Sequence, residues 1–317
     1  MATTRATSST IRLDLPDGLV VDATTDAGNA LFDRFFALYD LAFILPSEKE
    51  QRSGFVDCLA LNHGTAHARL AAAWGPFREW VLLVRDAGAG DNVVGGANFI
   101  CFALPVPGEP ALPAMHLNYI FVEPAHRRRG YLARIIRACQ ELARRTLEAP
   151  AGRTAPALLT FIEQNDPLRL SSDDYARDSA QAGIDQIDRV RIWQRAGARI
   201  IDFPYVQPAL SDDQLPDTGL LLSVIGAPGD ALDPCMLKRH LERFFAISVL
   251  KERDLASDGV AQRQLALCDE ARRAGKSLAL FDAGRWLDGL GAARPAGDGS
   301  PARLIDVLRA SSAVPGA

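Results

Sequence analysis

Three consecutive arginines, Arg127–Arg129, stand directly before Gly130 and the start of a predicted amphipathic helix. Positive charges at the N-terminus of a helix oppose the helix dipole, and each one costs about 0.3–1 kcal/mol when nothing compensates it. The same helix end offers unpaired backbone N–H groups, and a glycine there leaves room for a close approach. The cluster therefore indicates an anionic ligand, most simply a diphosphate or a pair of phosphates. The alternative is a solvated basic face whose arginines pair with carboxylates elsewhere.

Positive charge is concentrated around this cluster. Residues 126–145 hold seven arginines and one glutamate, a net charge of +6 (7 − 1), whereas the chain of 317 residues carries −4, so the remainder carries −10 (−4 − 6). The sequence pI is about 5.8, and a nucleic-acid-binding domain has a pI above about 9. A hydrophobic content of 48% excludes a chain that is disordered throughout. We therefore expect a folded protein with a local anion site and no nucleic-acid partner.

Hydrophobic periodicity predicts the elements that position the cluster. A strand at 116–122 precedes it, and an apolar stripe after it predicts a helix that packs on a sheet, formed by Leu132, Ile135, Ile136, Cys139, Leu142, Ala143 and Leu147. Further strands are predicted at 11–15, 80–85, 93–102, 157–162, 198–203 and 220–225. Further helices are predicted at 27–42 and at 187–196. A short helix is also predicted shortly after Pro46, with Ser47 or the acidic residues that follow it as its cap. The segment 87–92 predicts a hairpin turn, and the prolines of 105–113 predict a loop.

The pattern changes towards the C-terminus. Helical periodicity dominates in 233–255, 260–274 and 302–308, and the Gly-, Ala- and Pro-rich stretch 292–301 predicts a linker. We predict a mixed α/β sheet with helices on its faces over residues 1–226, followed by a helical C-terminal extension with a flexible tail over 227–317. The apolar stripe of the extension must pack against the first domain, against a second copy of the chain in a homodimer, or against both.

The succession of a strand, Val122-x-Pro124, Arg127-x-x-Gly130 and an amphipathic helix resembles the acyl-CoA-binding motif of the GNAT superfamily of N-acyltransferases. The family pattern is Arg/Gln-x-x-Gly-x-Gly/Ala, and this chain departs from it at Leu132. The segments 163–165 and 192–199 are similar to two further family features, a strand that ends in asparagine and a helix-to-strand turn. The resemblance covers residues 10–226 in element order and 115–203 by motif. It implies a GNAT-like domain with a mostly antiparallel sheet and helices on both faces.

The resemblance implies that acyl-CoA, by default acetyl-CoA, binds beside this motif. Backbone groups of Ile120–Val122 would hydrogen-bond the pantetheine arm where two parallel strands splay apart, and Asn165 would contact the same arm. Amides from Arg128 to Leu132 would hold the pyrophosphate. The residues implied in cofactor binding are Ile120, Phe121, Val122, Arg127, Arg128, Arg129, Gly130, Tyr131, Leu132 and Asn165.

The resemblance also implies direct attack of an amine on the thioester, which needs a base to remove the amine's proton. In the family this base is often a carboxylate on the motif strand, and that register holds His116 here. A histidine with an unperturbed pKa of about 6.5 suits the task, and in a regular strand His116 shares one face with Ile120 and Val122. The competing base is Glu163, at the end of the neighbouring strand. A histidine that only packs at the start of the strand is the remaining interpretation.

The general acid and the acceptor are less well marked. Trp193 stands where the family usually has a tyrosine acid, and Tyr131 and Tyr205 are the nearby tyrosines. The acidic segment 164–188 either attracts a cationic amine or is a solvated connection, and 45–50 forms either part of the acceptor wall or an ordinary loop.

The predicted function is therefore transfer of an acetyl or other short acyl group from acyl-CoA to a primary amine of a small molecule or a protein. Two alternatives keep the cofactor. One is an acyl-CoA decarboxylase or hydrolase on the same fold, and the other is a non-catalytic CoA-binding regulatory module.

Other features of the sequence set the expected location and metal content. The five cysteines lie far apart, which predicts reduced and mostly buried thiols in a cytoplasmic protein. His63 and His67 are four residues apart, but Gly64 stands where a zinc-protease helix has glutamate, so no metal is expected. The longest charge-free stretch, 93–108, is shorter than the ~20 apolar residues of a membrane span. The polar segment 1–10 predicts no signal peptide.

Overall fold

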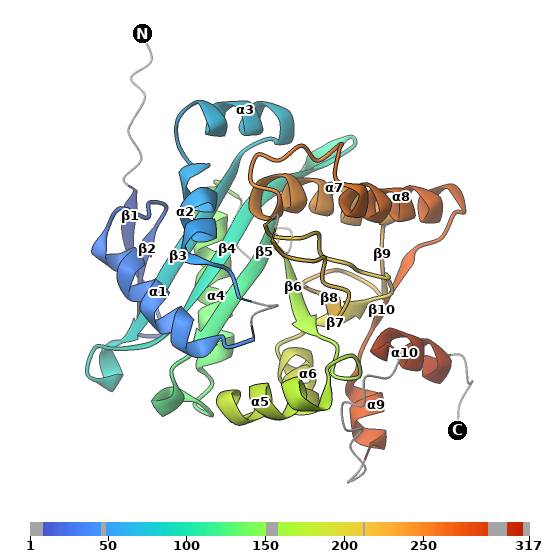
Figure 1. Ribbon diagram of the computed structural model, residues 1–317. Coiled ribbons are helices and arrows are strands. Elements are labelled where there is room, and N and C mark those ends of the chain that lie inside the picture. Colours follow the sequence, from blue (N-terminus) through green and yellow to red (C-terminus); the bar gives the residue numbers. More distant parts are fainter. Residues whose placement is uncertain (1–8, 46–48, 150–157, 212, 291–302, 313–317) are drawn as a thin grey trace.

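The structure, a computed structural model, describes residues 9–45, 49–149, 158–211, 213–290 and 303–312. A ten-stranded sheet runs through these residues in the order β1-β2-β3-β4-β5-β6-β8-β7-β10-β9 (Figure 1). Neighbouring strands are antiparallel except β5 and β6, which form the one parallel pair among the described strands. The strands are β1 (Thr10–Asp14), β2 (Leu19–Thr24), β3 (Phe77–Asp86), β4 (Asn92–Val106), β5 (Glu109–Val122), β6 (Leu159–Asn165), β7 (Arg199–Ile201), β8 (Leu220–Ile225), β9 (Ala231–Leu232) and β10 (Leu278–Phe281).

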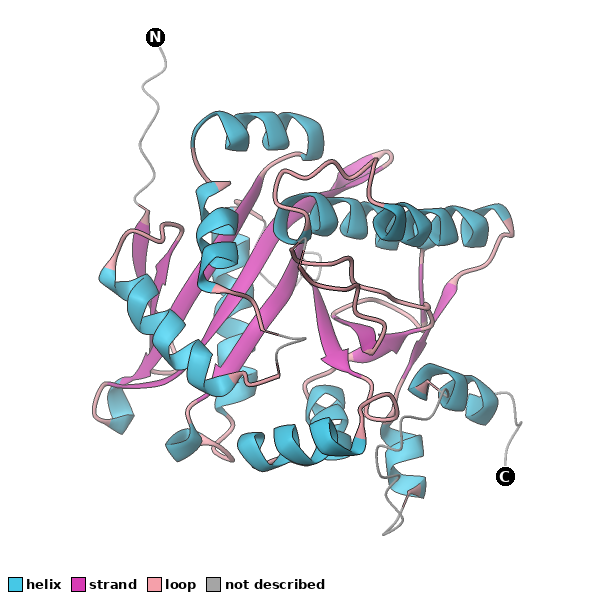
Figure 2. Ribbon diagram, in the orientation of Figure 1, coloured by secondary structure: helices cyan, strands magenta, loops and turns pink. Residues whose placement is uncertain are grey.

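Helices cover both faces of the sheet (Figure 2). On one face α4 packs against β2 to β5, and α6, α9 and α10 pack against β7 and β8. On the opposite face α1 and α2 pack against β3 and β5, and α7 and α8 continue this layer over β4, β6 and β8. The helices are α1 (Ala30–Ala42), α2 (Arg52–Ala60), α3 (Gly64–Trp74), α4 (Tyr131–Thr146), α5 (Ser172–Ala182), α6 (Gln186–Arg195), α7 (Pro234–Phe244), α8 (Gly259–Arg273), α9 (Gly284–Gly289) and α10 (Leu304–Ser312); short turns are η1 (Ala87–Ala89), η2 (Pro124–His126) and the π-helical η3 (Phe245–Val249).

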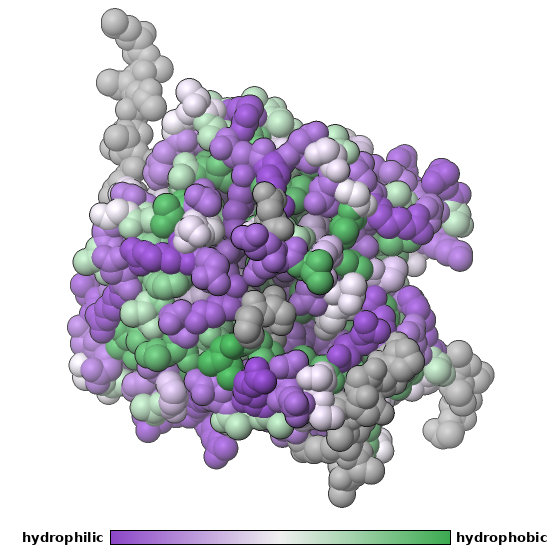
Figure 3. Space-filling view, in the orientation of Figure 1, coloured by the Kyte–Doolittle hydropathy of each residue, from purple (hydrophilic) through white to green (hydrophobic). Residues whose placement is uncertain are grey.

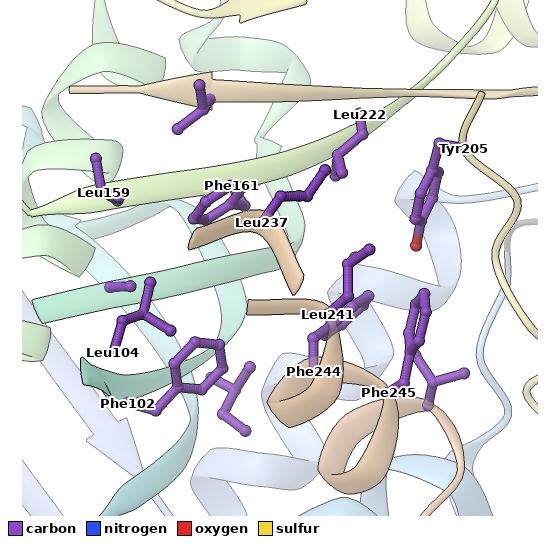
Figure 4. Packing of buried hydrophobic residues seen from close by; sticks show 14 of the residues in the cluster. Phe102, Leu104, Leu159, Phe161, Tyr205, Leu222, Leu237, Leu241, Phe244 and Phe245 are labelled. Atoms are coloured by element: carbon purple, nitrogen blue, oxygen red, sulfur yellow. The ribbon is translucent and has the colours of Figure 1, made fainter. Parts of the chain in front are cut away.

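Helix α7 is held to the middle of the sheet by large apolar side chains. Leu237, Leu241 and Phe244 are at most 2% exposed and belong to the same cluster as sheet residues of β4, β6 and β8. Figure 4 shows these side chains on the helix facing the strands, with Leu237 beside Phe161. Burying such a side chain stabilises the fold by about 1.5–3 kcal/mol. The helix is therefore part of the main core.

Helix α4 approaches the sheet closely because Gly95 of β4 lies beneath it and beside β5. A Cβ atom on Gly95 would lie 2.7 Å from the Cδ1 atom of Ile135 in α4 and would also collide with the Phe121 carbonyl. On Gly96 a Cβ atom would lie 2.8 Å from the Phe121 ring, on the face of α1. The missing side chain of Gly95 thus lets the N-terminal half of α4 lie next to β5, where the arginine cluster begins.

The face seen in Figure 3 is mostly polar. Apolar side chains show on it near α1, where Leu41 is 69% exposed. Leu41 lies at the end of α1 that adjoins the residues of the candidate site described below.

The predicted fold class is confirmed, because the sheet is mixed and mostly antiparallel, helices lie on both faces, and further helices follow towards the C-terminus. The loop predicted at 105–113 is wrong. Strands β4 and β5 continue through it and turn at Gly108, whose φ is +77°. Pro110 and Pro113 are tolerated because β5 pairs with β6 only from Ala114 onward, and Pro105 is tolerated because β4 pairs with β3 only as far as Phe102.

The prediction that the chain after residue 226 is helical needs a second correction. Strand β10 pairs with β7 through Leu280 and Ile201, and with β9 through Leu278 and Leu232. The run that forms β10 is short and uniformly apolar, so periodicity alone does not separate it from a helix.

The helix assignment from the sequence also differs from the structure in the polar segment after Asn165. Helix α5 lies in this segment, where no helix was predicted, and its one buried residue is Asp178. The helix expected after Pro46 is present as α2. Pro46, Ser47 and the predicted linker at 292–301 lie outside the described residues.

Candidate active site

Strands β5 and β6 stop pairing part-way along their length. Their parallel register runs from Ala114 and Leu159 to Leu117 and Ile162; beyond it β5 keeps β4 as its partner and β6 keeps β8. Figure 2 shows the two strands diverging towards their C-terminal ends. A cleft of about 1190 Å³ is lined by residues of both diverging strands. Backbone groups of β5 after Leu117 therefore face this cleft without a strand partner on that side.

A β-bulge at Asn118 changes the direction of the side chains along β5, because the register with β4 shifts by one residue there. After the bulge, Ile120 and Val122 pack in the cluster under α4. Before it, His116 stacks on Phe244 on the opposite face of the sheet. The expectation that His116 shares a face with Ile120 and Val122 is therefore wrong, since the alternation of a regular strand is interrupted between them.

The N-terminus of α4 lies at one end of the cleft. Arg128 and Gly130 have left-handed φ angles of +62° and +77°, and turns of this kind form concave arrays of backbone N–H groups that bind anions. Helix α4 begins without a side-chain cap, which leaves its first N–H groups available to a ligand. Arg128 is exposed, lines the cleft and makes no ion pair with any residue that the structure describes.

The other cluster arginines take different positions. Arg127 donates from Nε to the Val122 carbonyl at 3.2 Å and from NH1 to the Ala182 carbonyl at the end of α5. Nε2 of Gln181 donates to the Leu41 carbonyl at 3.0 Å. Helix α5 is therefore linked both to the end of β5 and to the end of α1. The hydrogen bonds of Arg127 form the link to β5.

Carboxylates offset part of the charge at the start of α4. Asp86 accepts hydrogen bonds from the Tyr131 hydroxyl at 2.7 Å and from NH1 of Arg134 at 3.1 Å, and Nε of Arg134 pairs with Asp17 at 3.0 Å. The bond from Tyr131 is the largest cause of the lowered pKa of Asp86. Pairing within the protein thus accounts for Arg134 but not for Arg128.

Most of the predicted cofactor residues come together in this cleft. It is lined by Ile120, Phe121, Val122, Arg127, Arg128, Gly130, Tyr131, Leu132 and Asn165, whereas Arg129 is exposed and is not among its lining residues. Asn165 ends β6, where it pairs with Leu220 of β8.

Glu163 lies where the two strands diverge and lines the cleft with an 11% exposed side chain. Its Oε1 accepts a hydrogen bond from the Tyr205 hydroxyl, and its Oε2 accepts one from Nε2 of Gln207 at 2.7 Å. Nε2 of His116 lies 3.6 Å from Oε2. Three polar groups of the protein thus surround one carboxylate at the edge of the cleft.

His116 is fully buried and is not among the residues that line the cleft. Its ring lies 3.6 Å from the parallel ring of Phe244, and its Nδ1 lies 3.0 Å from Nε2 of His240. Burial, and then the neighbouring His116, lower the pKa of His240 well below its usual value, so His240 is neutral. His240, in the C-terminal part of the chain, was not predicted because only folding brings it to β5.

The tyrosines near the cleft are poor acids. The buried Tyr205 donates to Glu163, and burial followed by the charge of Glu163 raises the pKa of Tyr205 well above 10. Tyr119 lines the cleft, a position that the sequence analysis missed, and its hydroxyl bonds to Tyr39. Burial raises the pKa of Tyr119 well above 10 too.

A second carboxylate lies behind the cleft on β3. Glu79 is 1% exposed and accepts hydrogen bonds from Nδ2 of Asn98 at 2.7 Å, Nδ2 of Asn118 at 2.9 Å and the Ser248 hydroxyl at 2.8 Å. Burial raises its pKa to about 7, partly offset by the bonds from Asn98 and Ser248. The sequence around Glu79 does not indicate this buried carboxylate site, because one of its hydrogen-bond donors, Ser248, comes from the distant π-helical turn η3.

Replacing Glu79 with glutamine is expected to change the free energy of unfolding more favourably at about pH 8 than at about pH 5. The difference between variant and parent is expected to differ by about 2–3 kcal/mol between the two pH values. The folded pKa is raised, so the contribution of Glu79 to stability is full below the unfolded pKa of about 4.3 and is lost as the pH rises through about 7. Urea denaturation of parent and variant at both pH values measures the difference. The exposed Glu270→Gln is the control, and an equal effect of Glu79→Gln at both pH values would contradict the assignment.

Acidic residues of α5 and α6 also line the cleft, but several already have partners. Asp178 pairs with Arg189 at 2.7 Å and Asp188 pairs with Arg191 at 3.2 Å. Across the cleft, the buried Glu50 pairs with Lys251. These partners offset part of the negative charge that the acidic residues present to the cleft.

No group of three or more potential metal ligands occurs among the described residues, and within the same residues no helix is long and apolar enough to cross a membrane. All five cysteines are free, and four of them are buried.

The model of a known protein family matches the part of the chain that carries this motif. The family is described as an acetyltransferase (GNAT) domain, and the match spans residues 26–150, from just before α1 to the end of α4. For this part of the chain, the match confirms the resemblance drawn from the sequence.

Curated relatives and solved structures add detail. The chain is 38% identical over 98 residues to N-acetyltransferase Eis of Mycobacterium tuberculosis and of Mycobacterium bovis; the match covers 31% of this chain and 22% of the relatives, about a fifth of their length. It is also similar to Arabidopsis thaliana NAA60 in complex with acetyl-CoA (TM-score 0.36, 10% identity, 65% of this chain and 99% of that one). A spermidine N-acetyltransferase, SpeG of Vibrio cholerae, has a TM-score of 0.33 and 11% identity over 66% of this chain and 94% of its own. At such TM-scores the structural likeness adds no argument to the family assignment.

Proposed function

We propose that the protein is an acyl-CoA-dependent N-acyltransferase that moves an acetyl or other short acyl group to a primary amine by direct attack. The observation that carries this proposal is the divergence of β5 and β6 beside the uncapped N-terminus of α4. An unpaired strand edge next to an anion site suits a ligand that joins an amide-containing arm to a diphosphate. Coenzyme A has that chemistry, and the GNAT domain at residues 26–150 supports the choice.

In this proposal the donor lies along β5. Backbone groups of Ile120–Val122 bind the pantetheine arm, with Asn165 on the other side, and the amides of 128–132 bind the pyrophosphate with charge added by Arg128. The thioester then lies where the strands begin to diverge, beside Asn118 and Glu163. Leu132 and Trp193 line the cleft on the α4 side of the sheet.

Glu163 is the base in this mechanism because it lines the cleft, whereas His116 lies behind it. Glu163 takes one proton from the ammonium, and the free amine nitrogen then attacks the thioester carbon to form the new C–N bond; the second proton that the nitrogen loses is taken up by the released thiolate. The C–S bond breaks and CoA leaves as a thiolate. A thiol has a pKa of about 8.5, so this leaving group needs little help from an acid, and the absence of a tyrosine at Trp193 is no obstacle.

The acceptor approaches from the face of α1, α2 and α7. Phe43, Phe55, Val249 and Leu210 provide apolar walls there, and Glu163 provides a carboxylate for a cationic amine. Small-molecule and protein amines both fit this description. The five free cysteines support a reducing compartment, and we propose the cytoplasm.

The proposal is tested by binding and by thiol release. Isothermal titration calorimetry with acetyl-CoA is expected to give saturable binding. Release of free CoA thiol from acetyl-CoA is expected only when an amine is added, using a panel of benzylamine, propylamine, spermidine and lysine, with mass spectrometry of the products. Equal thiol release without amine would favour the hydrolase alternative; a decarboxylase would leave the thioester intact and would instead release CO2 from a carboxylated acyl-CoA. Tight CoA binding without turnover across the panel would favour a regulatory module.

A further inference from the structure

Two buried histidines from distant parts of the chain form one coplanar pair behind Glu163. The rings of His116 in β5 and His240 in α7 are inclined by 10° with Nδ1 and Nε2 separated by 3.0 Å. Each ring is also stacked at 3.6 Å on a phenylalanine, His116 on Phe244 and His240 on Phe161. The stacks hold the plane of each ring, and the contact between the two nitrogens determines which edge of each ring faces the other.

One hydrogen lies between these two nitrogens, and the nitrogen to which it is bonded determines the tautomer of each ring. If it belonged to His116 Nδ1, the bare Nε2 of a neutral His116 would face the Glu163 carboxylate at 3.6 Å, and lone pairs would oppose each other. The neutral His240 would then carry its proton on Nδ1, a buried atom with no hydrogen-bond partner among the described residues. A buried N–H without an acceptor costs about 1–3 kcal/mol.

The opposite arrangement removes both penalties. With the proton on His240 Nε2, His116 accepts at Nδ1 and carries its own proton on Nε2, which lies 3.6 Å from Oε2 of Glu163, an electrostatic contact beyond hydrogen-bond distance. The buried N–H of His116 then faces a carboxylate, and His240 Nδ1 is left with a lone pair in place of an N–H that has no acceptor. This arrangement satisfies the most groups with the same two protons.

We propose that His240 is a positioning residue of the acyl transfer: it donates from Nε2 to His116 and so holds His116 as the Nε2–H tautomer that orients Glu163. This inference rests on the proposed function for its effect on catalysis, but the tautomers themselves do not depend on turnover. It also assigns a role to His116. A ring nitrogen that already carries a proton towards Glu163 faces the carboxylate with an N–H and does not remove the proton of the amine.

The tautomers are tested first, by NMR of the full chain labelled with ¹⁵N. The protein has five histidines, so long-range ¹H–¹⁵N spectra of the imidazole rings are simple, and substitution of each histidine assigns them. At about pH 8, where a solvent-exposed histidine is neutral, His116 and His240 are both expected to show the Nε2–H pattern. A His116 with its proton on Nδ1 would overturn the inference.

The effect on catalysis is tested with His240→Phe, which keeps a ring against Phe161 and removes the N–H donor. We expect kcat for the fastest amine of the panel to fall about 10-fold, as for one lost hydrogen bond, while the acetyl-CoA Kd changes less than about twofold. His240→Gln supplies an N–H group again and is expected to recover part of the loss. His67→Phe, on α3, is the matched control and is expected to keep the parent kcat.

The outcomes separate this inference from the proposed function. If the parent protein turns over no amine, the proposed function fails, and the tautomer spectra still decide the assignment of the protons. If the parent is active and His240→Phe keeps its kcat, the positioning role is refuted. A His240→Gln variant as slow as His240→Phe would also refute it, because packing would then explain the loss. Should His240→Phe fail to fold, the spectra of the parent protein remain decisive.

Discussion

Replacing Arg128 and Gly130 together with glutamate is expected to weaken acetyl-CoA binding by about 1000-fold. Hydrogen bonds to charged groups contribute about 1.5–3 kcal/mol each. The double variant replaces the cation of Arg128 with a carboxylate, and it places a second carboxylate where Gly130 leaves space for the phosphates. A total of about 4 kcal/mol corresponds to that factor in Kd. Arg128 is suited to this test because it lines the cleft and makes no ion pair with any described residue.

Calorimetry with acetyl-CoA measures the change, and two control variants separate its causes. Arg137→Glu alters the charge on an exposed position of the same helix that does not line the cleft, and it is expected to leave the Kd within about threefold. Gly130→Ala tests the strain of a side chain at a φ of +77° without adding charge. Unchanged affinity in the double variant would place the phosphates elsewhere.

Replacing Glu163 with glutamine is expected to lower kcat by about 100-fold or more, since general-base catalysis by a positioned side chain contributes about 100- to 10,000-fold. Glutamine has nearly the same shape and can still accept a hydrogen bond from Tyr205, but it cannot take a proton from the amine. Glu163 lies at the edge of the cleft and not at the α4 N-terminus, so the Kd of acetyl-CoA is expected to stay within about threefold. Steady-state thiol release and calorimetry give the two numbers.

The matched comparison is His116→Phe, which keeps an aromatic ring beside Phe244. If Glu163 is the base and His116 only orients it, the His116 variant loses about 10-fold, the worth of one hydrogen bond, and much less than Glu163→Gln. The reverse order of the two effects would make His116 the base. Equal and small effects would remove both residues from the mechanism.

The part of the site that the sequence could predict is contiguous in the chain. A strand, three arginines, a glycine and an amphipathic helix occupy 119–147 and carry their own periodicity and charge pattern. Of this segment, the structure places 119–122, Arg127, Arg128 and 130–132 among the residues that line the cleft, whereas the rest of the helix lies outside it. Arg127 shows the limit of such reasoning, because a charge in a motif does not reveal that its guanidinium bonds to the carbonyl of Ala182.

What the sequence could not predict depends on distant contacts or on small breaks of regularity. His240 pairs with His116 across 124 positions, and Ser248 reaches Glu79 across 169. The bulge at Asn118 shifts the pairing of β4 with β5 by one residue, and no residue type at that position predicts it. Each of these features follows from how α7, η3 and β5 pack, and no local pattern encodes that packing.

The cleft is lined from both faces of the sheet, with Leu132 and Trp193 on the α4 side and Phe55 and Val249 on the side of α2 and α7. Two reactants entering from opposite faces would both be present before reaction, so initial-rate plots should intersect rather than run parallel. A single compound in which an amine is joined to coenzyme A through a short acetyl bridge would occupy both entrances at once. Such a bisubstrate conjugate should therefore inhibit far more strongly than either half, and it would trap the assembled complex for crystallography.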